Sequence, residues 1–378
     1  MTRMPHPTAQ PQTSSFGRWS LPVGEGSRVG GVDAPATRDL ASFAPVVGRI
    51  RRPLRRRLAA ATPWRLPSVT ADAGELGRGW LAAASLAGGG HLHRGRSGQD
   101  SYSFAPTRDG AGLVMAVADG LGSRPETAQL GALVAARLLC HELARHSTDT
   151  LFDVSSGSVH GAVRTVNRQL TEVCQRLDGR LSARDLATTV AACITAADPG
   201  DPRRLFVRVG DCAAFMLRGD GFVPVFDRDG GPTNVVTAAL PTDGGELPDG
   251  SVQTARVDEG AGAVVLTTDG VCEDIYDSPT VRAWLASRWS RPCEVMAFVD
   301  ALRYRRQGSH DDRTALVVWP PQPASPAGPD GRQPTGEPAR DRAAVRSLAP
   351  LQAATNRLRR RRARRRLGRF RRRGPRRE

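Results

Sequence analysis

The chain contains no lysine, so each of its 54 lysine-or-arginine positions is an arginine. This absence excludes a P-loop, whose motif requires Gly-Lys before Ser or Thr, and no strand-linked Gly-x-Gly-x-x-Gly replaces it. The six cysteines are scattered without a Cys-x-x-Cys pair, which argues against structural zinc and disulfides and fits a reducing compartment. A run of about 18 apolar residues and a signal-peptide core are also missing. We therefore expect a cytoplasmic protein without a transmembrane segment.

The formal charge of +16 is concentrated in two arginine runs. Residues 357–378 contain fourteen arginines and one acid, residues 49–57 contain six arginines and no acid, and the rest of the chain is slightly acidic. A run as dense as 357–377 would attract nucleic acid or an anionic membrane surface without sequence specificity. Alternatively, the arginine run is a compositional by-product of a GC-rich gene without a function. The sequence leaves both interpretations open.

Composition divides the chain into three parts. Residues 1–73 and 320–378 are rich in Pro, Ser, Gly and Arg, which predicts disordered segments around one domain at 74–319. Inside that domain, helical periodicity predicts helices at 125–146, about 159–177 and 279–305. Apolar runs predict strands at 80–86, 112–118, 188–196, 204–209, 213–218, 222–226, 252–257, 263–268 and 314–319. This order is typical of an α+β domain rather than of repeated βαβ units.

Five aspartates stand in similar contexts, next to glycine or at the edge of a predicted strand. They are Asp100, Asp119, Asp211, Asp269 and Asp311. Carboxylates held by a rigid frame, with no Cys or His cluster beside them, form an all-oxygen site that suits Mg²⁺ or Mn²⁺. Taken alone, each motif is weak, because Asp-Gly is more commonly a turn and VGDCAAF between two strands reads as a hairpin.

The order of the motifs carries more information than any one of them. GGGHLHRGRSGQDSY, AVADGLGS, LATTVAACI, VGDCAAFML, LTTDGVCED and SHDDRTALVV together resemble the bacterial metal-dependent serine/threonine protein phosphatases of type 2C. The resemblance covers about 85–319. It implies an α+β fold, a four-layer α-β-β-α sandwich of two central, mainly antiparallel sheets flanked by helix pairs, with a two-metal cleft at one end.

The resemblance also implies roles for individual residues. Asp119 would bridge the metals and Gly120 would offer its carbonyl, while Asp269 and Asp311 would hold the first metal. Asp100 would act close by, directly or through a water. Three acids would support this set, namely Asp211, Asp274 as the last acid of the L-x-S-D-G-x-x-D pattern, and Asp312 in place of the usual asparagine. The two Asp-Gly turns are thus expected to meet at one metal cluster.

The implied reaction is hydrolysis of phosphoserine and phosphothreonine in proteins by a metal-bound hydroxide, with two or more Mn²⁺ or Mg²⁺ ions. His91 or His93 is a candidate general acid, and Arg94 or Arg96 could replace an arginine that the family often places at residue 95. The expected partners are phosphorylated proteins, the targets of serine/threonine kinases. Two alternatives stay open: a catalytically inactive phosphopeptide-binding scaffold, and a protein that acts through its arginine run on nucleic acid or an anionic surface.

Overall fold

The computed structural model describes residue 47 and residues 67–320, with gaps at 77–78, 122–124, 177–179, 199, 220, 229–235, 237, 244 and 259–261. The predicted disorder of 320–378 and of most of 1–73, and both arginine runs, lie outside the described residues. In the described part, no helix is long and apolar enough to cross a membrane.

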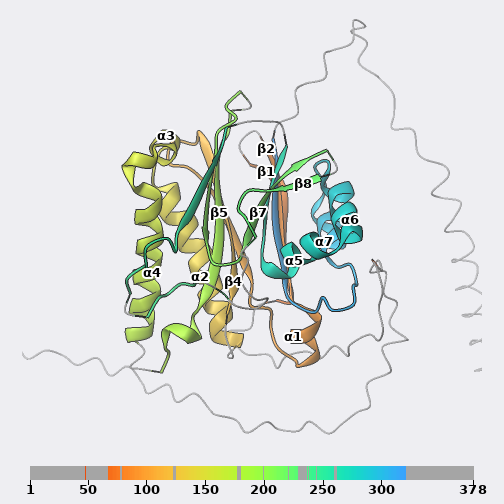
Figure 1. The fold of residues 1–378 in the computed structure, drawn as a ribbon, viewed down its shortest axis with the longest axis horizontal. Helices are drawn as coiled ribbons and strands as arrows, with labels where there is room; N and C mark the ends of the chain where they lie inside the picture. The colour runs from red at the N-terminus through yellow and green to blue at the C-terminus, as the bar shows by residue number, and fades with distance from the viewer. Residues whose placement is uncertain are drawn as a thin grey trace, which may run out of the picture. The chain divides into compact units, whose positions relative to one another are not determined.

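Two antiparallel sheets form the centre of the molecule (Figure 1). The six-stranded sheet has the order β1 (Val69–Leu76), β2 (Gly79–Leu86), β11 (Arg313–Trp319), β10 (Ala263–Thr267), β7 (Ala213–Arg218) and β8 (Gly221–Pro224). The five-stranded sheet has the order β3 (Ser101–Pro106), β4 (Gly112–Gly120), β5 (Thr188–Ala196), β6 (Arg204–Val209) and β9 (Gln253–Val257). The inner strands β4 and β5 are continuous apolar runs because both of their faces are buried.

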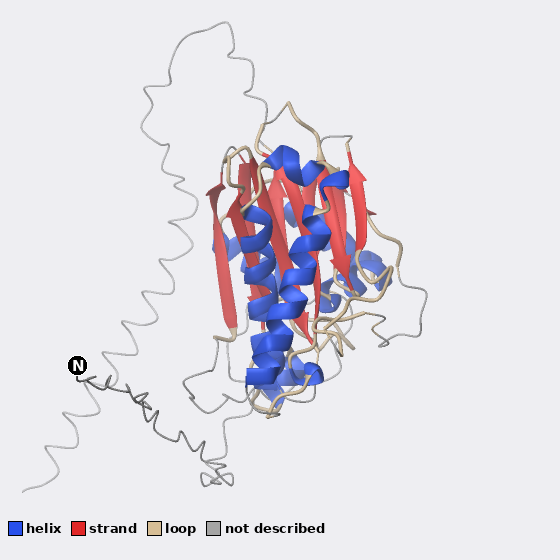
Figure 2. Ribbon diagram, turned by 90° about the vertical axis from the view of Figure 1, so that its left-hand side faces the viewer, coloured by secondary structure: helices blue, strands red, loops and turns tan. Residues whose placement is uncertain are grey.

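Helices cover the outer face of each sheet. The long helices α2 (Pro125–Ala144) and α4 (Ser158–Arg176) lie over the five-stranded sheet, as Figure 2 shows from that side. Helices α5 (Asp269–Asp277), α6 (Pro279–Trp289) and α7 (Val295–Leu302) cover the six-stranded sheet. A third hydrophobic cluster, which includes Met115, Phe206 and Leu316, fills the space between the sheets. The predicted four-layer α-β-β-α fold is therefore confirmed, although three helices rather than a pair cover the second sheet.

The sequence missed both strands that form one open side of the sandwich. β1 begins at Val69, before the predicted domain start at 74, and β3 follows directly after Asp100. Both strands are rich in Ala, Ser and polar residues because an edge strand buries little of its surface. Val47 also belongs to the folded part, since it is buried and its N–H donates to the Arg305 carbonyl over 3.0 Å.

The helical regions differ from the prediction in two places. The region predicted at 279–305 is divided into α6 and α7 by an irregular segment containing Pro292, which cannot donate a helical hydrogen bond. Helix α5 was not predicted because its first two residues, Asp269 and Gly270, read as a turn. The remaining short α-helices are α1 (Gly89–His93) and α3 (Thr148–Phe152).

Candidate metal centre

Five separate segments bring their aspartates to one end of the sandwich. Asp100 precedes β3, Asp119 is the second-last residue of β4, Asp211 lies between β6 and β7, Asp269 opens α5, and Asp311 precedes β11. The charge of Asp119 interacts with those of Asp100, Asp211 and Asp311, and that of Asp269 interacts with Asp119, Asp211 and Asp311. The five aspartates singled out in the sequence are therefore connected by charge interactions through Asp119 and Asp269.

The electrostatics of this cluster are unfavourable without a cation. Desolvation, followed by the neighbouring carboxylates, raises the pKa of Asp100, Asp119 and Asp269 well above its ordinary value. The pKa of Asp311, at the exposed mouth, is also raised, first by desolvation. The neighbouring Asp100 carboxyl contributes to the raised pKa of Asp119. Divalent cations would offset this repulsion between carboxylates.

Neither Asp-Gly pair is a turn, contrary to the expectation from sequence. Asp119 and Gly120 still belong to β4 and pair with Thr189 and Thr188 of β5. A Cβ on Gly120 would lie 2.4 Å from the Ala128 carbonyl oxygen. Gly270 follows Asp269 in the first turn of α5, and its Cβ would lie 2.0 Å from the Asp312 carbonyl oxygen. Both glycines are thus required by close backbone approach beside the cluster.

The sequence around Asp211 suggested a hairpin, but the structure has none there. β6 and β7 belong to different sheets, so the chain crosses between the sheets at Gly210, which has a φ of 86°. The Oδ1 atom of Asp211 is buried there and has no hydrogen-bond partner among the described residues. A buried carboxylate oxygen without a donor is costly, and a cation would satisfy it.

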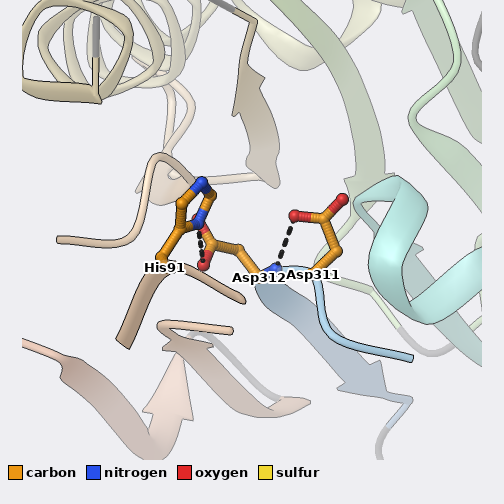
Figure 3. Close-up of side chains that lie close together, drawn as sticks. All are labelled: His91, Asp311 and Asp312. Carbon is orange, nitrogen blue, oxygen red and sulfur yellow. Dashed lines mark hydrogen bonds and ion pairs between the residues drawn. The ribbon is translucent and has the colours of Figure 1, made fainter. Parts of the chain in front are cut away.

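His91 and Asp312 form a bonded pair beside Asp311 (Figure 3). The His91 Nδ1 atom lies 2.9 Å from Asp312 Oδ1. Asp312 also accepts the N–H groups of Gly88 and Gln99, each at 2.5 Å, and its own N–H donates to Asp311 Oδ1 at 2.9 Å. The hydrogen bond to Asp312 raises the pKa of His91. With three donors around its carboxylate, Asp312 positions the loop before Asp100 and is poorly disposed to bind a metal itself.

The two candidate arginines lie on the exposed loop after α1. Arg94 is close enough to His91 to oppose its protonation, an effect that lowers the pKa of His91. The Arg96 side chain is exposed as well. The structure therefore brings Arg94 to the histidine, and it does not bury either arginine among the carboxylates.

Asp274 lies away from the cluster. Its buried carboxylate accepts hydrogen bonds from the Tyr304 hydroxyl and the Ser309 hydroxyl, each at 2.6 Å, and from Arg306. In the L-x-S-D-G-x-x-D pattern the final acid stands four residues after the first aspartate. Counted from Asp269, that position is Glu273 and not Asp274. Glu273 interacts with Asp269, Asp211 and Asp311, so sequence reasoning missed this residue by one position.

The chain matches the family model described as protein phosphatase 2C over residues 87–302, which is more than half of its 378 residues. The chain therefore belongs to the protein phosphatase 2C family of metal-dependent serine/threonine phosphatases. It is a protein phosphatase of this class, and the resemblance inferred from its six motifs is confirmed. A search of curated proteins found no match.

Solved structures with a similar fold include the Mycobacterium tuberculosis serine/threonine phosphatase PstP/Ppp, at 19% identity over 64% of this chain and 98% of that chain, with a TM-score of 0.46. The catalytic domain of PstP in complex with two manganese ions matches at 20% identity over 63% and 96%, with a TM-score of 0.45. RsbX in complex with magnesium matches at 16% identity over 66% and 98%, with a TM-score of 0.42.

Proposed function

We propose that Asp119, Asp269 and Asp311 bind two or more Mn²⁺ or Mg²⁺ ions, with the Gly120 carbonyl and Asp100 beside them. The observation that carries this assignment is the convergence of carboxylates whose pKa values are raised by one another. Hard divalent cations prefer oxygen ligands, which is the donor set present here. Asp211, with its unpartnered Oδ1 atom, and Glu273 lie on the side of the cluster towards α5 and could hold a further ion.

The surrounding hydroxyls orient the proposed ligands. Thr268 donates to Asp100 Oδ2 at 2.7 Å, and Thr188 donates to the Asp119 carbonyl at 2.6 Å. The first contact fixes the Asp100 carboxylate, and the second holds the backbone that carries Asp119, as outer contacts of metal ligands do. When bound, the ions would activate a water molecule and neutralise the phosphoryl oxygens of the substrate. The bond that breaks joins phosphorus to the serine or threonine oxygen, and that oxygen must receive a proton.

His91 is the proposed donor of that proton. It lies at the mouth beside Asp311, and Asp312 fixes its ring through Nδ1, which leaves Nε2 as the atom available to a substrate. The raised pKa of His91 favours the protonated form that a general acid needs. Arg94, on the same loop, is the proposed phosphate contact, and Arg96 is the second candidate for that contact.

The proposed substrates are phosphoserine and phosphothreonine side chains of proteins that serine/threonine kinases have modified. We also propose a cytoplasmic location, supported by six free cysteines of which five are buried thiols. The arginine run at 357–377 remains a proposed contact for nucleic acid or an anionic surface, and it lies outside the described residues.

Phosphate release from a phosphothreonine peptide by the full chain tests the proposal. We expect turnover with Mn²⁺ or Mg²⁺, none with EDTA, and little with the matched phosphotyrosine peptide. The Asp119→Asn variant should be inactive, and the Asp249→Asn variant, changed at an exposed acid in a surface turn, should be as active as the wild type. A folded chain that binds the phosphopeptide without hydrolysing it would support the scaffold alternative instead.

A further inference from the structure

A groove of about 370 Å³ runs along the open side of the sandwich formed by β1 and β3. The edge strand β3 packs against β2 of the opposite sheet, so β1 extends one strand beyond β3. The groove lies in the place below β1 where a sixth strand of the five-stranded sheet would pair with β3. Asp100 lines one end of it, and the remainder runs away from the carboxylate cluster.

The backbone of β3 offers free hydrogen-bonding groups to this groove. The Thr107 N–H donates to the Gly112 carbonyl at 2.9 Å, which places the odd-numbered residues of β3 in hydrogen-bonded pairs with β4. Because the pattern alternates, the N–H and C=O groups of Tyr102 and Phe104 point to the opposite side. In the described part of the chain no strand pairs with that edge. Such an edge is a template for another extended segment.

The walls of the groove carry opposite charges. Ala71 and Ala73 pack on the helix side of β1, so Thr70 and Asp72 face the groove as its roof. The floor is a stripe of α2 in which side chains recur every four residues, namely Gln129, Leu133 and Arg137. Asp72 and Arg137 are both exposed.

Aromatic rings separate the groove from the core between the sheets. The Tyr102 hydroxyl donates to Asp72 Oδ2 at 2.7 Å, which joins β3 to β1. The Tyr102 and Phe104 rings are parallel, with centroids 6.5 Å apart. An inward side chain of an added segment would therefore meet an acid and two ring surfaces, while an outward side chain would meet Arg137.

We propose that this groove binds an extended segment of a partner protein as a sixth strand beside β3. Backbone hydrogen bonds to Tyr102 and Phe104 would supply affinity, as in other cases of strand addition. The charges set the pattern of the segment: a basic side chain turned towards Asp72 and the aromatic rings, and an acidic side chain turned towards Arg137. The groove binds this segment with or without metal in the carboxylate cluster.

A labelled hexapeptide, Thr-Arg-Glu-Val-Thr-Arg, tests the charge pattern by fluorescence anisotropy with the full chain in EDTA. Its alternate residues place arginine and valine on one face and threonine and glutamate on the other. We expect saturable binding that is about tenfold tighter than that of Thr-Arg-Thr-Glu-Val-Arg, which has the same composition with all three charges on one face. Arg137→Glu and Asp72→Lys should each weaken binding about fivefold or more, while Arg168→Glu, on the exposed face of α4, should not.

Backbone methylation separates strand addition from simple charge attraction. Two versions of the peptide carry N-methyl groups at alternate residues, one at positions 1, 3 and 5 and the other at positions 2, 4 and 6. Only one set can face β3, so we expect one version to lose about tenfold in affinity and the other to bind almost as the parent. Equal affinities of the two versions would overturn the proposal, as would the absence of saturable binding by the parent peptide. A dimer of the full chain that dissociates on Arg137→Glu would assign the groove to a second copy instead.

Discussion

At the scale of single residues, the site combines acids that repel one another with a histidine that an acid holds in place. Asp100, Asp119 and Asp269 have raised pKa values because burial and mutual repulsion disfavour their charged forms. His91 has a raised pKa because Asp312 accepts its hydrogen bond. This difference supports the proposed roles, namely metal binding for the three aspartates and proton donation for His91.

The role of His91 predicts a dependence on the leaving group. His91→Gln should lower kcat on a phosphoserine peptide by about 100-fold or more, since an alkoxide needs a proton as it leaves. The same variant should hydrolyse p-nitrophenyl phosphate at nearly the wild-type rate, because p-nitrophenolate leaves without one. Steady-state kinetics on the two substrates measure this split. An equal loss on both would show that His91 serves binding or structure and is no general acid.

At the scale of elements, the buried Asp274 joins α5, which begins with Asp269, to the loop that ends in Asp311. Asp274 accepts the hydrogen bonds of Tyr304, Ser309 and Arg306 described above. Its Oδ2 atom also lies 3.6 Å from Arg313 Nη2, and the Arg313 guanidinium stacks on the Tyr304 ring. This network fixes two proposed metal ligands relative to each other without touching a metal.

Removing the Asp274 carboxylate should destabilise the fold strongly. Asp274→Ala leaves the largely buried Arg313 and the partly buried Arg306 without their acid, which costs about 3–5 kcal/mol for a buried pair. Asp300→Ala removes the exposed ion pair with Arg303 and should cost less than about 1 kcal/mol. Urea unfolding of both variants in EDTA measures the difference. Similar small losses would contradict the network's structural role.

The close approach at Gly270 gives a second prediction at this scale. Gly270→Ala would force a methyl group against the Asp312 carbonyl, so the first turn of α5 must move and Mn²⁺-dependent hydrolysis should fall by about tenfold or more. The control is Gly161→Ala at the fourth residue of α4, where a Cβ meets nothing within 4 Å. That change should stabilise the protein by about 0.5–1 kcal/mol and leave hydrolysis intact. Wild-type activity in Gly270→Ala would show that the contact is not required.

At the scale of the whole molecule, the sequence predicted the strands that are buried on both faces. It missed the features that depend on how the elements are assembled. Strands such as β4, β5 and β10 were predictable because buried strands are continuous apolar runs. The edge strands β1 and β3 lack that signal, and the Asp-Gly start of α5 resembles a turn. Local pattern also cannot show that the chain leaves one sheet at β6 and enters the other at β7. The five aspartates were found through their positions beside glycine or a strand edge, and motif order then connected them to one site. Glu273 was missed through an error in spacing.

The assembled cluster predicts how stability depends on pH and metal. A carboxyl whose pKa is raised in the folded state binds more protons there than in the unfolded chain, so its stabilising contribution falls as pH rises above about 4. In EDTA, the free energy of unfolding should therefore decrease as the pH rises from 4 to 6. The raised pKa of His91 also makes stability fall as pH rises, but only near and above the ordinary histidine pKa of 6.5.

Saturating Mn²⁺ should abolish most of that decrease, because the ions replace the protons that the cluster otherwise binds. Urea unfolding at several pH values, with EDTA and with Mn²⁺, measures both curves. Stability that rises with pH in EDTA between pH 4 and pH 6 would contradict the raised pKa values of the carboxyls.

The most direct test of the central claim is calorimetric titration of Mn²⁺ into the full, metal-free chain. If the aspartates of five segments form one metal centre, the wild type should bind two or more ions, and Asp119→Asn should lose most of this binding because Asp119 faces three of the other four. Asp249→Asn should bind as the wild type does. Absence of saturable binding by the wild type, or unchanged binding by a folded Asp119→Asn variant, would contradict the account.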